Sequence, residues 1–116
     1  MIKVIGLLTR KAGLSHREFS DYWHNVHAPL GERIVPPEAK SARYVQNHAL
    51  LAKEGASAAY DAVAELYFRD HAAMQRWIDW YNSDAGKVLR DDEHNFMDVA
   101  KRVVIVTDER VMRDNL

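Results

Sequence analysis

The chain has 116 residues, of which 47% are hydrophobic and 28% charged, the size and composition of a single globular domain over 1–116. Its formal net charge is −1 with the two signs mixed along the chain, which argues against nucleic acid or an anionic membrane surface as a partner. It has no cysteine for disulfides or thiolate chemistry, no secretory signal and no apolar run near the roughly 20 residues of a membrane helix, so we expect a cytoplasmic protein.

A strand and a capped helix are predicted at the start of the chain. Residues 2–10 are rich in aliphatic and β-branched side chains, which favour a strand. Ser15 and Glu18 have the spacing of a capping box, which predicts a helix that begins at Ser15. The apolar residues at i, i+3, i+4 and i+7 would form its buried stripe, namely Phe19, Tyr22, Trp23 and Val26. Pro29 predicts the end of the helix, so His27 would lie in the last turn, where the helix dipole favours an imidazolium.

The remaining elements complete a β-α-β-β-α-β order. In sequence, we expect a loop over 29–41, a strand over 42–50, a small-residue link over 52–59, a strand over 61–69, a helix capped by Asp70, a short helix from 82, a polar turn over 91–95 and a strand over 101–107. The apolar run 103–106 indicates burial on both faces, and 108–116 would be a polar tail that could reach another subunit. This order is typical of the ferredoxin-like α+β fold, a four-stranded antiparallel sheet with both helices on one face.

The strand over 61–69 indicates how the other face of the sheet is used. Its alternating residues form one apolar side that can meet the helices, made of Ala62, Ala64, Leu66 and Phe68. The other side mixes Val63 and Tyr67 with Asp61 and Glu65. Because such a face is too apolar to be left in water, we expect a homodimer that closes two sheets into a dimeric α/β barrel.

Several stretches of the sequence resemble the EthD family of the dimeric α/β-barrel superfamily. The most specific match runs from Leu8 to Ser15, through the aromatic stripe, to His27 and Pro29; further matches lie in 44–48, 61–68 and 92–96. The resemblance implies the dimeric barrel and relates the chain to methylmuconolactone isomerases and to polyketide dehydratases and cyclases. It also implies active-site positions for His27 and Tyr44. The cysteine that some of those isomerases carry has no counterpart here.

Three residues of the strand over 42–50 join His27 as candidates for the site. Tyr44, Gln46 and His48 alternate along the strand and so share one face, and if Tyr44 faces the barrel, so do the others. Together they could orient a carbonyl or lactone oxygen and move a proton, with Gln46 as a substrate-binding residue. The alternatives are that His27 only caps its helix and that this face of the strand is solvated.

Charged residues near the strand ends supply further candidates. Glu65 could act as a base or hold a histidine in one tautomer, while Asp61, Tyr67 and Arg10 are candidate substrate-binding residues. The alternative for the two carboxylates is a structural ion pair with one of the arginines, Arg10, Arg43 or Arg102.

These residues predict an enzyme without a cofactor that moves protons on a small cyclic or aromatic carbonyl or lactone compound in the barrel cavity, as an isomerase, dehydratase or cyclase. His27 would shuttle the proton, Tyr44 and His48 would hold the oxygen, and Glu65 would orient a histidine or act as base. No metal is expected, because His24 in the His24-x-x-His27 spacing would face solvent. The alternatives are an oxygenase or haem-dependent oxidoreductase of the same superfamily, and a non-catalytic protein that binds a small molecule.

Overall fold

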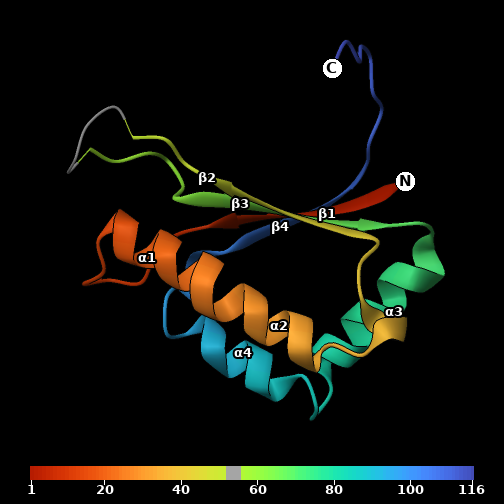
Figure 1. The fold of residues 1–116 in the computed structure, drawn as a ribbon, viewed down its shortest axis with the longest axis horizontal. Coiled ribbons are helices and arrows are strands. Elements are labelled where there is room, and N and C mark those ends of the chain that lie inside the picture. Colours follow the sequence, from red (N-terminus) through yellow and green to blue (C-terminus); the bar gives the residue numbers. More distant parts are fainter. Residues whose placement is uncertain (52–55) are drawn as a thin grey trace.

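The computed structural model describes residues 1–51 and 56–116 and has two layers, a sheet and the helices that cover one face of it (Figure 1). Its strands are all antiparallel in the order β2-β3-β1-β4, with β1 (Ile2–Leu8), β2 (Arg43–His48), β3 (Ala62–Phe68) and β4 (Val103–Asp108). The helices are α1 (His16–Tyr22), α2 (Ala28–Ile34), α3 (His71–Asn82) and α4 (Lys87–Glu93). The predicted ferredoxin-like α+β fold is confirmed. Residues 52–55 of the predicted link lie outside the described residues.

The first helix begins where the sequence predicts. Ser15 Oγ accepts a hydrogen bond from the backbone N–H of Glu18, and the Glu18 carboxylate accepts one from the N–H of Ser15, each at 3.0 Å. This capping box satisfies two donors that the first turn would otherwise leave unpaired. The helix packs onto the sheet through a buried core that consists of Leu8, Phe19, Trp23, Ala62, Phe96 and Met97.

The predictions that this helix ends at Pro29 and that a loop covers 29–41 are wrong. A π-helical turn, Trp23–His27, leads directly into α2, and Pro29 is the second residue of α2, so the proline does not end the helical segment. His27 therefore lies inside a continuous helical segment and not at a helix C-terminus, so neither the expected dipole effect nor the capping alternative applies. The wider π turn also rotates Val26 off the predicted stripe and leaves it 45% exposed.

The second half of the chain supplies α3 and α4. Asp70 caps α3 as predicted, because its side chain accepts a hydrogen bond from the N–H of Ala73 (2.8 Å). The predicted polar turn over 91–95 is wrong in its first half, because α4 extends to Glu93. Asp92 and Glu93 are consecutive residues of this helix, and both side chains make contacts inside the molecule.

β4 is an edge strand, and its apolar run is not buried on both faces in the single chain, contrary to the prediction. Its four aliphatic residues are 39 to 56% exposed, namely Val103, Val104, Ile105 and Val106. Val103 and Ile105 lie on the face that no helix covers, and Val104 and Val106 border an open cavity on the other face. Beyond β4, residues 109–116 extend away from the body of the molecule (Figure 1). No helix within 1–51 and 56–116 is long and apolar enough to cross a membrane.

Candidate active site

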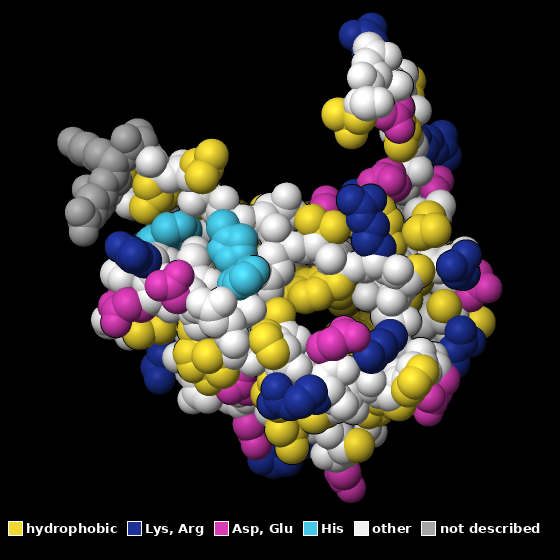
Figure 2. Space-filling model, in the orientation of Figure 1, with side chains coloured by type: hydrophobic (Ala, Val, Ile, Leu, Met, Phe, Trp, Pro, Cys, Tyr) yellow, Lys and Arg dark blue, Asp and Glu magenta, His cyan; other side chains and the backbone are white. Residues whose placement is uncertain are grey.

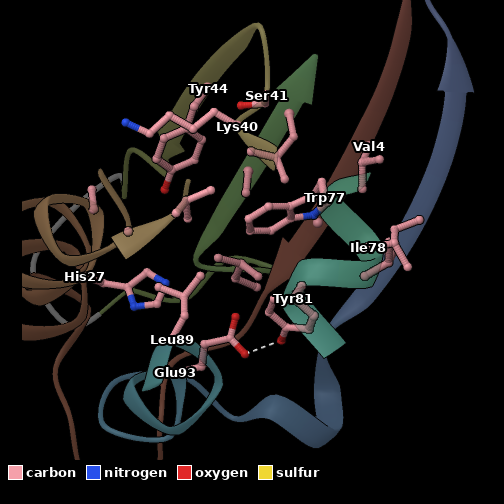
Figure 3. Close-up of a pocket in the computed structure, with 18 of the residues that line it drawn as sticks. Val4, His27, Lys40, Ser41, Tyr44, Trp77, Ile78, Tyr81, Leu89 and Glu93 are labelled. Atoms are coloured by element: carbon pink, nitrogen blue, oxygen red, sulfur yellow. Dashed lines mark hydrogen bonds between the residues drawn. The ribbon is translucent and has the colours of Figure 1, made fainter. Parts of the chain in front are cut away.

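A cavity of about 690 Å³ lies between the sheet and the helices. Its floor consists of alternate strand residues that point to the helix side of the sheet, namely Val4, Gly6, Leu8, Ala64, Leu66, Val104 and Val106. The helices provide the opposite wall, which includes Trp23, His27, Trp77, Ile78 and Tyr81 (Figure 3). Figure 2 shows the opening of this hollow, with hydrophobic side chains inside it. A mostly apolar cavity of this volume with a few polar groups is typical of a small-molecule site.

His27 is held at the wall of the cavity by Asp92. Its Nδ1 donates a hydrogen bond to Asp92 Oδ2 (2.8 Å), while Tyr22 Oη and Asn95 Nδ2 donate to Asp92 Oδ1 (2.6 and 3.1 Å). Because an ionised carboxylate can only accept, the proton on His27 Nδ1 is fixed by this contact. In the neutral ring Nε2 is then the nitrogen that can accept a proton from a substrate. The carboxylate–histidine pair therefore has the form of an oriented general base.

The surroundings of Asp92 keep it ionised at neutral pH. Burial raises its pKa, but the hydrogen bonds from Tyr22, His27 and Asn95 outweigh burial and hold the pKa below its usual value. Burial and the adjacent Asp92 carboxylate raise the pKa of the Tyr22 hydroxyl, which consequently remains a donor. The hydrogen bond from the His27 imidazole therefore has a negatively charged acceptor, the Asp92 carboxylate.

Tyr44, Gln46 and His48 share one face of β2, as predicted, and this face is directed towards the helices. Gln46 Nε2 donates to Tyr44 Oη (2.8 Å) and to the carbonyl oxygen of Trp23 (3.2 Å), and Gln46 Oε1 accepts from His48 Nε2 (3.0 Å). Because Tyr44 Oη already accepts from Gln46, its own hydrogen is free to donate to a ligand. Figure 3 shows the Tyr44 hydroxyl pointing into the cavity.

The pKa shifts on this strand favour neutral side chains. Desolvation raises the pKa of Tyr44, against the opposing effects of Gln46 and Trp23, so the hydroxyl keeps its proton at neutral pH, although the residue as a whole is 43% exposed. Burial, followed by the charges of His24 and His16, lowers the pKa of His48. His48 is not among the residues that line the cavity; its ring packs on Trp23 at 4.8 Å between centroids. Gln46 and His48 therefore lie behind Tyr44 and position it.

Glu65 does not lie beside His27 or His48, and the prediction that it orients a histidine is wrong. Strand alternation places Ala64 and Leu66 in the cavity and Glu65 on the opposite face of the sheet. There its carboxylate pairs with Lys3 Nζ (3.2 Å), a partner outside the three arginines expected for an ion pair. Tyr67 lies on the same outer face, where its ring packs under Lys3 and its hydroxyl donates to Glu109 (3.2 Å).

Asp61 and Arg10 lie together at another end of the sheet. Asp61 accepts hydrogen bonds from the backbone N–H of Arg10 (2.8 Å), from Arg10 Nη1 (3.1 Å) and from His16 Nδ1 (3.0 Å). The structural ion pair considered as the alternative for Asp61 is therefore present, and neither residue lines the cavity. In the described parts of the chain, no three His, Asp or Glu side chains are grouped so as to hold a metal ion.

Two carboxylates of the site were missed from the sequence. Asp92 holds His27, the role expected of Glu65, and Glu93 lines the cavity together with Tyr81 and Arg102. Tyr81 Oη donates to Glu93 Oε1 (2.5 Å), and Arg102 donates to Glu93 Oε2 and to Tyr81 Oη, both at 3.1 Å. The one available signal was the place of both residues in the 92–96 stretch that resembles the EthD family.

The comparisons with known proteins agree with this fold. The sequence matches the EthD domain over residues 11–100. An EthD family protein from Bacillus halodurans has 21% identity and a TM-score of 0.65, with 95% of this chain and 99% of that chain covered. An EthD-like protein from Ralstonia eutropha has 19% identity and a TM-score of 0.70, with 99% and 96% covered.

A ferredoxin-like protein from Thermobifida fusca, described as dimeric, has 16% identity and a TM-score of 0.57, with 91% of this chain and 88% of that chain covered. No curated protein matches the sequence significantly. The domain match spans most of the chain, and the solved structures share its fold over nearly their whole length. The chain therefore belongs to the EthD family.

Proposed function

We propose that the protein is an acid–base enzyme that needs no cofactor and acts on a small cyclic or aromatic carbonyl or lactone compound, as an isomerase, dehydratase or cyclase. The observation that carries this proposal is the Asp92–His27 pair at the wall of an apolar cavity that also receives the Tyr44 hydroxyl. A histidine oriented by a carboxylate and an oxygen-binding donor on the same cavity are the groups that proton transfer next to a carbonyl requires.

The chemistry assigns one step to each group. His27 Nε2 takes a proton from the carbon next to the carbonyl, and the electron pair of the broken C–H bond forms an enolate. The Tyr44 O–H donates to the enolate oxygen, where the negative charge develops. Protonated His27 then returns its proton to a different carbon, which is an isomerisation, or to a departing hydroxyl group, which is a dehydration. Asp92 stabilises the imidazolium between the two transfers.

The test measures proton exchange, so it does not require the physiological substrate. In D₂O, the wild-type protein should accelerate deuterium uptake next to the carbonyl of 2-tetralone, followed by proton NMR. His27→Ala should slow this exchange by about 10²–10⁴, and Tyr44→Phe by about 10² or more. His94→Ala is the matched control, because His94 is exposed and follows α4.

Two results would contradict the proposal. Exchange in His27→Ala at the wild-type rate would remove the histidine from the reaction. Tight binding of the ketone with no exchange above the buffer rate, in the wild-type protein, would support the non-catalytic binding alternative.

We also propose that the protein is a homodimer that pairs the outer faces of two sheets. The outer face carries apolar side chains with no helix over them, including Ile5, Leu7, Val63, Val103 and Ile105. Burying such residues against a second copy is favourable. The dimeric description of the similar Thermobifida fusca protein supports the same assembly.

A further inference from the structure

Besides His27 and Tyr44, a second polar group lines the cavity. It consists of Glu93 and the two residues that donate hydrogen bonds to it, Tyr81 and Arg102. The Glu93 side chain is only 8% exposed, yet the residue lines the cavity. In Figure 3, Glu93 reaches towards Tyr81 from the cavity wall, and His27 lies on the other side of Leu89. Asp92 and Glu93 are thus adjacent in α4 but serve different groups, one behind His27 and the other directly on the cavity.

The hydrogen bonds of this group leave Glu93 with unused acceptor capacity. A carboxylate has roughly four lone-pair sites. Tyr81 Oη uses one on Oε1 and Arg102 Nη1 uses one on Oε2, at 2.5 and 3.1 Å. The Tyr81 hydroxyl hydrogen is already donated to Glu93, and the Tyr81 oxygen accepts a hydrogen bond from Arg102 Nη2 (3.1 Å). The trio therefore offers a ligand mainly acceptor sites on a buried carboxylate.

We infer that Glu93 is a specificity-determining residue that accepts a hydrogen bond from a hydroxyl group on the substrate. This inference deepens the proposed function and rests on it for the position of the carbonyl group at His27 and Tyr44. The substrate class is then a hydroxylated aromatic or enolic carbonyl compound, with its hydroxyl group and its carbonyl group at different ends of one flat molecule.

The charge and shape of the cavity select a neutral, flat donor. Arg102 already compensates the Glu93 carboxylate, so an ammonium group brought to the same carboxylate would meet the guanidinium charge. A hydroxyl group satisfies the free acceptor sites without adding charge. Trp77 and Tyr81, with ring centroids 5.6 Å apart, form an aromatic wall opposite the aliphatic strand residues, which suits a planar ring system.

The test compares three ligands that differ at one position: 6-hydroxy-2-tetralone, 6-methoxy-2-tetralone and 2-tetralone. Isothermal titration calorimetry on the wild-type protein should give a Kd for the hydroxy compound at least tenfold lower than for the other two, as expected for a hydrogen bond to a charged acceptor. In Glu93→Gln the preference should fall to within about threefold. Glu32→Gln is the matched control, because Glu32 also borders the cavity but is 77% exposed at its side chain and pairs with Lys40.

A second variant keeps the inference testable if Glu93→Gln does not fold. Tyr81→Phe removes a donor to Glu93 but retains the carboxylate, so it should keep or strengthen the preference for the hydroxy compound. Loss of the preference in Tyr81→Phe would assign the recognition to the Tyr81 hydroxyl and overturn the inference. Equal affinity of the wild-type protein for all three ligands would overturn it as well.

The readouts separate this inference from the proposed function. His27→Ala should keep the hydroxyl preference while it loses deuterium exchange. A wild-type protein that shows the preference but no exchange would contradict the proposed function and leave Glu93 as a binding determinant. A wild-type protein that exchanges 2-tetralone protons without any hydroxyl preference would contradict the role of Glu93 alone.

Discussion

Asp61 shows how a polar residue that the sequence suggests for substrate binding can instead stabilise the fold. Its carboxylate binds Arg10 at the end of β1 and His16 at the start of α1, and His16 Nε2 also contacts the carbonyl oxygen of Ala49 (3.0 Å). Both partners of the His16 ring are acceptors, so the two hydrogen bonds form together only when the ring carries both protons. Burial raises the pKa of Asp61, but the hydrogen bonds and charges of Arg10 and His16 outweigh burial and lower it.

Replacing this carboxylate should reduce stability. We expect Asp61→Asn to lower the free energy of unfolding by about 1.5–3 kcal/mol at pH 7, because hydrogen bonds to a charged group are lost. Urea unfolding followed by circular dichroism measures the change. Asp21→Asn, at an exposed carboxylate, should stay within about 0.5 kcal/mol of the wild type.

The same variant tests the dependence of stability on pH. Because the folded pKa of Asp61 is lowered, the folded state binds fewer protons in acid than the unfolded state, and stability falls as protons are added. The contribution is complete above the ordinary value of 3.8 and is lost as the pH falls through the lower folded pKa. Asp61→Asn should therefore show a shallower loss of stability from pH 5 to 2; an unchanged slope would contradict this account.

At the scale of elements, the corner between α3 and α4 decides where Tyr81 and Glu93 meet. Gly86 lies in this corner against backbone: a Cβ placed on it would overlap the carbonyl oxygens of Trp80 and Tyr81. Arg90 fixes the same corner by donating hydrogen bonds to the carbonyl oxygens of Tyr81 and Ser83. The close approach of the two helices therefore requires glycine at this position.

Replacing Gly86 and Gly31 by alanine should have opposite effects on the stability of the protein. Gly86→Ala should destabilise the protein by about 1–3 kcal/mol, because the backbone must move to admit the methyl group. Gly31→Ala, inside α2 and only in ordinary contact with Leu89, should stabilise it by about 0.5–1 kcal/mol. Thermal unfolding of both variants measures the two signs, and a neutral Gly86→Ala would show that the corner tolerates a Cβ.

At the scale of the whole molecule, the helices cover one face of the sheet and leave the other without a layer (Figure 1). That outer face combines aliphatic residues with a charged group that joins Lys3, Glu65 and Glu109 around Tyr67. The pairs of Lys3 with the two carboxylates raise its pKa, so the charge is retained at neutral pH. The cavity lies on the helix side of the sheet, so the proposed dimer does not need to supply the catalytic residues.

A charge on the outer face should separate the proposed dimer. Ile105 is 48% exposed in the single chain and pairs with Ile5 across the strands. Ile105→Arg should give monomers in size-exclusion chromatography with light scattering, because a buried, unpaired charge is costly. Val88→Arg, at a residue on α4 with 56% exposure, is the control that should remain dimeric. A wild-type monomer would contradict the assembly.

Local patterns in the sequence were sufficient for much of the fold. The capping box at Ser15, the cap at Asp70 and the alternation of β3 are short-range properties, and each is present as predicted. They are set by the hydrogen bonds of neighbouring residues and by the period of the chain, which do not depend on distant segments. The shared face of Tyr44, Gln46 and His48 follows for the same reason.

Only the tertiary structure decided which face of the sheet forms the cavity and which carboxylate holds His27. Alternation separates Glu65 from Ala64 and Leu66 and correctly predicts that the Ala64 side meets the helices, but it cannot say that the cavity lies on this side. The continuation of the helix past Pro29 depends on a π turn that the packing of Trp23 and His27 supports, and Asp92 comes from a helix 65 residues further along the chain. Contacts between segments so far apart arise from packing, which no local pattern in one sequence records.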